Sequence, residues 1–186
     1  MSIYGKKTIR SVLAGGAFVV ALILCAPQQS GADQNMPTGK AFIAKVAQIN
    51  VNEQQLGHLA EQKGSKDAVK DFGKRMVEDH SHAESQLKKL AERKGVTLPA
   101  GPDAKASSLE QQLSAKSGTQ FDRDYLEHMI AGHKQAIALL KNEIQRGKDP
   151  AIKAYAKNTL PTIQEHLRLA ESAAGKNNAS AAADLH

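Results

Sequence analysis

The stretch TQFDRDYLEHMIAGHKQAIALLKNEIQRGKDP, residues 119–150, contains one long helix, a turn and the start of the next helix. Gly147 ends the first helix, and Asp149 followed by Pro150 provides an N-cap and a first helical residue for the second. Thr119 is the predicted N-cap of the first helix. The stretch therefore predicts a helical hairpin. Its apolar residues recur every three or four positions, as on one face of an α-helix: Phe121, Tyr125, Met129, Ala136, Leu140 and Ile144.

The same spacing predicts three further helical segments. Two long helices are expected over 41–63 and 66–94, separated by Gly64 and with Ser65 as the second N-cap. A shorter helix is expected over 104–116, after a crossing that contains proline and glycine.

These segments define one all-α domain over residues 41–174, because no part of the chain alternates as a strand does. Two tight turns and one longer crossing suit an antiparallel four-helix bundle. The short extra helix lies in the crossover between the second and third long helices. Residues 175–186 are small and polar, and we expect them to be disordered.

Residues 1–32 have the layout of a secretory signal peptide. Lys6, Lys7 and Arg10 precede an uncharged run over 11–27, and no acidic residue occurs. The apolar part is about fifteen residues, short of the roughly 20 that a membrane-spanning helix needs. We expect cleavage near Asp33 and export to the periplasm. Lipid attachment at Cys25, with outer-membrane association, is the alternative.

Composition excludes several classes of function. The formal net charge of +6 falls to +3 without the three cations of the predicted signal, and this small excess argues against a nucleic-acid partner. The single cysteine lies in the predicted signal, so the mature domain has neither a disulfide nor a thiolate. No stretch resembles a catalytic triad or a phosphate-binding loop.

Each long helix places one metal-ligand type of side chain on its apolar face: Glu53, His80, His133 and His166. Counted from the two tight turns at about 1.5 Å per residue, the four lie within about two helical turns of each other. Burying them is costly unless they pair or bind something. Three imidazoles and a carboxylate suit zinc, iron, copper or manganese. Asp79, beside His80, is expected to orient an imidazole or to add an oxygen ligand.

The same residues also have an explanation without a metal. A histidine on an inner helix face is commonly a hydrogen-bonded core residue, and Glu53 can pair with one of the histidines. The chain is then a structural or interaction module of the cell envelope, with an envelope protein as its partner. A third hypothesis, that a redox-active metal makes the protein an enzyme, requires turnover with oxygen or peroxide.

Five blocks resemble, in order, the bacterial family called domain of unknown function 4142, over about residues 41–172. The resemblance implies a ferritin-like bundle in exported bacterial proteins and supplies no established activity. The resemblance implies a set of ligand-type positions, and Asp122 is the only one of them that the helix faces had not already indicated. A carboxylate at this position also suits the positive end of its own helix. The positions are Glu53, Asp79, His80, Asp122, His133 and His166. The blocks are LGHLA (56–60), RMVEDH (75–80), GVTLP (95–99), SGTQFDRDYLEHMIAGH (117–133) and LPTIQEHLRLA (160–170).

The histidines do not match the di-iron pattern of ferritin-like proteins, which requires two Glu-x-x-His motifs. The residues three positions before His80, His133 and His166 are Val77, Ile130 and Ile163. We therefore expect a histidine-rich site for a single ion, serving storage, sensing or stress protection.

Overall fold

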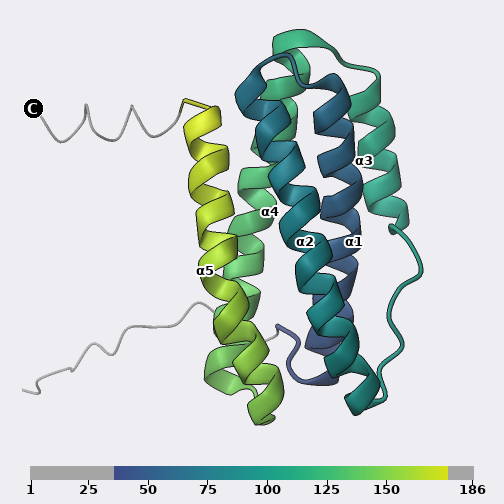
Figure 1. Cartoon of the computed structure of the whole chain (residues 1–186), viewed down its shortest axis with the longest axis vertical. Coiled ribbons are helices and arrows are strands. Elements are labelled where there is room, and N and C mark those ends of the chain that lie inside the picture. The colour runs from purple at the N-terminus through teal and green to yellow at the C-terminus, as the bar shows by residue number, and fades with distance from the viewer. Residues whose placement is uncertain (1–35, 176–186) are drawn as a thin grey trace, which may run out of the picture.

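The computed structural model describes residues 36–175, and this part of the chain folds into five α-helices with no strand (Figure 1). The all-helical prediction is confirmed for these residues. The predicted signal peptide lies outside them, as does nearly all of the predicted C-terminal tail. The helices are α1 (Lys40–Lys63), α2 (Asp67–Lys94), α3 (Ala104–Ser114), α4 (Gly118–Arg146) and α5 (Pro150–Ala173).

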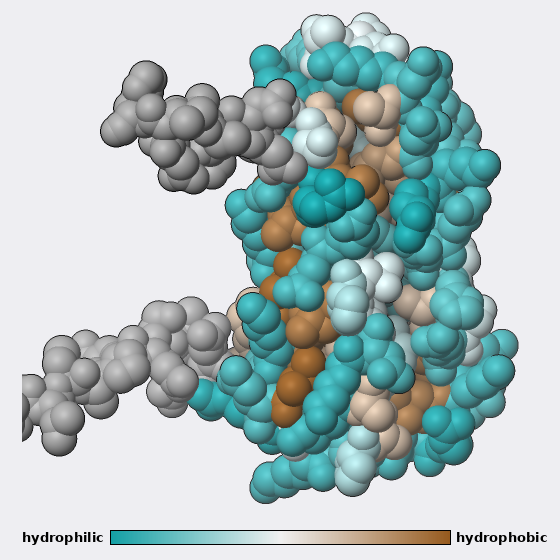
Figure 2. Space-filling view, turned by 60° about the vertical axis from the view of Figure 1, so that its left-hand side comes forward, coloured by the Kyte–Doolittle hydropathy of each residue, from teal (hydrophilic) through white to brown (hydrophobic). Residues whose placement is uncertain are grey.

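The four long helices lie side by side as two hairpins. α1 packs along α2 and α4 packs along α5, while α2 also contacts α5 and α1 also contacts α4 (Figure 1). The short helix α3 packs against α1 and α4 on the outside. Figure 2 shows a mostly hydrophilic surface, with hydrophobic residues gathered in narrow strips. No helix among residues 36–175 is both long and apolar enough to cross a membrane.

Two predicted helix caps are wrong, and the third is confirmed. α2 has Lys66 rather than Ser65 as its N-cap residue, and α4 has Ser117 rather than Thr119. Neither cap residue makes a side-chain capping hydrogen bond. Asp149 does cap α5, because its carboxylate accepts from the backbone N–H groups of Ala151 and Ile152.

Asp122 of α4 caps the N-terminus of α2. Its carboxylate accepts the backbone N–H of Ser65 at 2.8 Å and that of Lys66 at 3.2 Å, together with the Ser65 hydroxyl. The sequence explanation, a favourable charge on its own helix, missed these contacts because they join residues 57 positions apart. Asp122 therefore fastens the start of α4 to the α1–α2 turn.

The apolar core consists of two clusters of buried side chains. One contains Phe42, Leu87, Leu140 and Ile152, and the other contains Leu56, Phe72, Tyr125 and Ala170 among others. Along each long helix, a buried polar residue lies between the segments that supply the two clusters. We call these residues the polar layer: Asn50, Glu53, His80, His133 and His166.

Two glycines bring α1 and α2 into close backbone contact. A Cβ built on Gly73 would lie 2.7 Å from the carbonyl oxygen of Gly57, and one built on Gly57 would lie 2.8 Å from that of Gly73. Both distances are far inside van der Waals contact, so only glycine permits this approach. Gly132 of α4 differs, because the nearest atom to its built Cβ is a Glu53 oxygen at 3.5 Å.

We expect Gly73→Ala to lower the free energy of unfolding by about 1–3 kcal/mol, because the added methyl group forces two backbones apart. Gly132→Ala is the matched control. Its methyl group fits, and alanine favours a helix interior by about 1 kcal/mol, so its stability should not fall. Urea unfolding of both variants and the parent measures the difference. Equal stability of Gly73→Ala and the parent would contradict the close contact.

Candidate metal centre

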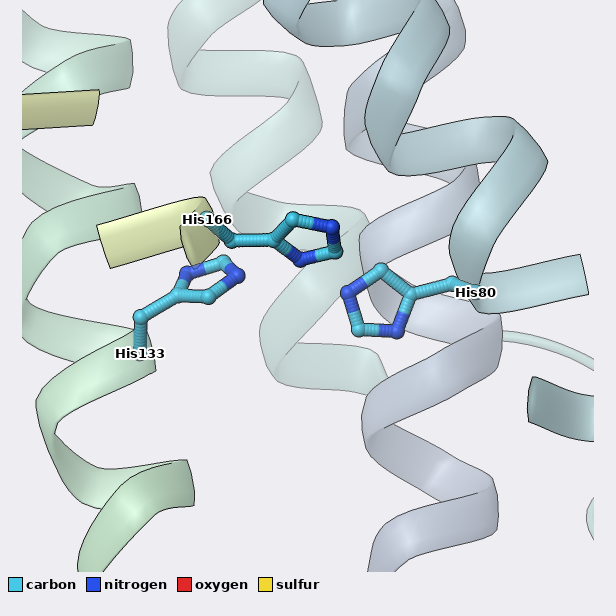
Figure 3. A group of neighbouring side chains, drawn as sticks. All are labelled: His80, His133 and His166. Carbon is cyan, nitrogen blue, oxygen red and sulfur yellow. The ribbon is translucent and has the colours of Figure 1, made fainter. Parts of the chain in front are cut away.

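Three histidines from three different helices meet in the polar layer. His80 comes from α2, His133 from α4 and His166 from α5, and each side chain is at most 2% exposed. One ring nitrogen of each lies within 4.8 Å of the corresponding nitrogen of the other two. Figure 3 shows the three rings pointing toward one another from their separate helices. The sequence prediction that these histidines converge therefore agrees with the structure.

Each imidazole is held on its outer side by one oxygen acceptor. His80 Nδ1 donates to Asn50 Oδ1 at 3.1 Å, and His133 Nδ1 donates to the Met129 carbonyl at 2.7 Å. His166 Nε2 donates to Asp79 Oδ2 at 2.8 Å.

The second ring nitrogens are buried and have no hydrogen-bond partner among residues 36–175. They are His80 Nε2, His133 Nε2 and His166 Nδ1. A neutral imidazole has one N–H and one lone pair, so the nitrogen that faces an oxygen carries the proton. The three unpartnered nitrogens are therefore acceptors whose lone pairs lack a donor. Leaving such atoms unpaired in a buried site costs free energy, which a cation among them would recover.

The electrostatics keep the histidines in the neutral state that binds metal. Burial lowers the pKa of all three, bringing that of His133 to about 4. The neighbouring imidazoles lower the pKa values of His80 and His133 further. All three rings are consequently neutral at pH 7, and each has one lone pair available as a ligand.

Asp79 lies against His166 rather than against its sequence neighbour His80. Burial alone would raise its pKa, but hydrogen bonds from Arg75 and His166 outweigh that effect and lower it. The resulting carboxylate fixes the His166 ring and increases the basicity of its free nitrogen. Carboxylates play this part behind many metal-bound histidines.

Glu53 is buried in the same layer but outside the group formed by the three nitrogens. Its carboxyl faces Gly132 of α4 and lines a cavity. Within the described part of the chain its Oε2 atom has no hydrogen-bond partner, and burial raises its pKa to about 8. The predicted role of Glu53 as a metal ligand stays a prediction.

Sequence reasoning missed two groups that hold the histidines. Asn50 is buried and forms a hydrogen bond with His80. The sequence did contain one indication of this role, because Asn50 is a polar residue one helical turn before Glu53 and so lies on the same helix face. The Met129 carbonyl is a backbone atom and leaves no trace in the sequence.

Comparisons with known proteins identify a family and a fold. The family model described as "Domain of unknown function (DUF4142)" matches residues 25–173. Among solved structures, the chain is similar to the "Crystal structure of DUF305 fragment from Deinococcus radiodurans", with 16% identity and a TM-score of 0.65. That match covers 75% of this chain and 99% of the other, and it concerns the fold alone. None of the curated proteins matches the chain.

The buried carboxyl of Glu53 makes stability depend on pH. Its pKa is about 8 in the folded state against an ordinary 4.5, so the folded state binds the proton more tightly. Its contribution to stability is therefore full below pH 4.5 and is lost as the pH rises through 8, by roughly 3–5 kcal/mol. In the Glu53→Gln variant the side chain cannot ionise, so we expect its free energy of unfolding to fall less than that of the parent as the pH rises.

Urea unfolding of metal-free protein between pH 5 and 8.5 measures this difference. Glu127→Gln is the matched control, because Glu127 is an exposed glutamate on α4. Its stability should follow the pH dependence of the parent. Parallel curves for Glu53→Gln and the parent would show that Glu53 ionises normally.

Proposed function

This chain belongs to the DUF4142 family, as its sequence blocks predicted, and we propose that it binds a single transition-metal ion through His80, His133 and His166. The ion would serve storage, sensing or stress protection in the periplasm. Asp79 orients His166 from outside the ligand group.

One observation carries the proposal: three buried imidazole nitrogens without a hydrogen-bond partner lie together. A core that needed only hydrogen-bonded histidines would pair these nitrogens with donors. Here each ring uses its N–H on an outer acceptor and keeps its lone pair for the centre. Three lone pairs at one point favour a positive ion.

The donor set narrows the choice of metal. Neutral imidazoles suit zinc, copper and iron, while manganese prefers oxygen ligands. Three histidines leave room for a fourth ligand, such as water, on a tetrahedral ion. The missing Glu-x-x-His motifs argue against a di-iron centre.

The proposal extends to the architecture and location predicted from the sequence. The two hairpins, with α2 against α5 and α1 against α4, support an antiparallel four-helix bundle of ferritin-like type over residues 41–174. The short helix α3 is then an addition within the crossover. We also propose that residues 1–32 direct export to the periplasm. The cationic, then apolar, sequence of this segment supports export.

Titration of EDTA-treated protein with zinc, copper(II) and iron(II) tests metal binding. We expect one ion per chain, with at least a 100-fold loss of affinity in the His80→Ala/His133→Ala double variant. His82→Ala is the matched control, because His82 is exposed on the same helix and bonds to Gln86. Circular dichroism of each variant verifies that it is folded.

Three results would count against the metal site. They are no uptake by the parent, unchanged uptake in the double variant, and a melting temperature independent of metal, which the metal-free envelope module predicts. Glu53→Gln tests the predicted ligation by Glu53. Because the Glu53 carboxyl lies outside the group of three nitrogens, we expect the metal affinity of the variant to stay within about twofold of that of the parent. Elemental analysis of protein from its native source identifies the ion.

Asp79→Asn tests the carboxylate behind His166. The side chain keeps its shape and loses its charge, so the His166 ring is less basic and less firmly oriented. We expect a loss of metal affinity of about tenfold, at the lower end of the effect of such partners. The same titration measures it, with Glu78→Gln, an exposed neighbour, as control. An unchanged metal affinity would mean that Asp79 contributes only its ion pair with Arg75 and does not support metal binding by His166.

A further inference from the structure

A cavity of about 400 Å³ lies between α1, α3 and α4, beside the metal centre. It is lined by residues from all three helices, including Ile49, Leu56, Leu109, Leu139, Glu53 and Gly132. None of the three histidines of the proposed metal centre lines it. We call it the α3 cavity. Its size is that of a pocket for a small organic molecule.

Glu53 is the buried polar group of the α3 cavity. Its side chain is 7% exposed, and in the described residues no donor reaches its Oε2 atom. Gly132 lies opposite, and a Cβ built there would stand 3.5 Å from Glu53 Oε1. The missing side chain thus leaves space in front of the carboxyl. In its ionised form a buried carboxyl without a donor is costly unless a ligand supplies one.

The outer wall of the cavity is fastened by polar contacts. Asn52 of α1 and Asp103, the N-cap of α3, exchange two hydrogen bonds of 3.2 Å. Gln48 also donates to the Gly101 carbonyl at 3.1 Å. These contacts hold α3 over an apolar wall formed by α1 and α4. The cavity is therefore a formed site with one buried carboxyl and apolar inner sides.

We propose that the α3 cavity binds a small primary alkylamine, with its ammonium group on Glu53 and its alkyl chain against Ile49, Leu56, Leu109 and Leu139. An ammonium group provides three donors and a positive charge, while the carboxyl oxygens only accept when ionised. Charge-assisted hydrogen bonds are roughly twice as strong as neutral ones. The alkyl chain gains from burial against the apolar wall.

The other charged groups around the cavity are compatible with this ligand. Lys45 and Lys105 are exposed at the mouth, where solvent screens their repulsion of a cation. Asp103 stands at the mouth as well, and hydrogen bonds from Ala106 and Asn52 favour its ionised form. His128 and Gln135 also belong to the polar part of the lining. The innermost of these groups is Glu53, which sets the preference for a cation.

Binding of three six-carbon probes to EDTA-treated protein tests the proposal at pH 9, which is above the pKa of about 8 that burial gives Glu53. The probes are n-hexylamine, 1-hexanol and hexanoate, which differ in the charge of the head group. We expect the amine to bind at least tenfold more tightly than the alcohol, and hexanoate not to bind. Calorimetry gives the affinities, and amide NMR shifts in α3 and around Gly132 locate the ligand. Because metal is absent, failure of the metal centre does not affect the result.

Two variants separate the contributions of charge and space. Glu53→Gln should weaken the amine at least tenfold and leave the alcohol within about twofold. Gly132→Ala should weaken both probes, because its methyl group fills the space before Glu53. Alanine favours helix at that position, so this loss cannot come from unfolding. No binding of the amine, equal affinity for amine and alcohol, or an unchanged amine affinity in Glu53→Gln would each overturn the proposal.

Discussion

Three imidazole lone pairs that face one another inside an apolar core are the constraint on which this structure depends. Each of His80, His133 and His166 has its N–H committed to an oxygen on its outer side, so none can donate to another. Those oxygens belong to a side chain of α1, a backbone carbonyl of α4 and a carboxylate of α2. The position of every long helix is therefore linked to the orientation of the rings.

The two apolar clusters fix the helices on either side of this layer. An α-helix turns about 100° per residue, so a shift of one residue along any helix would swing its histidine out of the core. Phe42 and Leu87 on one side, with Phe72 and Tyr125 on the other, oppose such a shift. Asp122 and the Gly57–Gly73 contact fix the α1–α2 hairpin further. The polar layer is costly in isolation, and the packing around it holds its members in place.

Helix spacing alone was enough to predict the helices and the convergence of the histidines. Apolar positions three and four apart located the helices, and a rise of 1.5 Å per residue placed the histidines at similar heights. The sequence did not show that Asp79 serves His166, because that contact crosses from α2 to α5. It also did not separate Glu53 from the nitrogen group, because that separation depends on how far α1 is rotated. The α3 cavity could not be predicted, because the position of α3 depends on the irregular segment between α2 and α3, which has no periodic pattern of apolar residues.

Consecutive residues of α4 explain why a metal centre and a cavity can share one helix. Gly132 and His133 differ by about 100° in direction around the helix axis. His133 consequently points into the core, and Gly132 opens toward Glu53 and the α3 cavity. Within residues 36–175, the high pKa of Glu53 follows from burial. The histidines and Glu53 thus lie in one layer as buried polar groups that lack partners among residues 36–175: the imidazole nitrogens direct lone pairs toward one another, and the Glu53 carboxyl lines the α3 cavity.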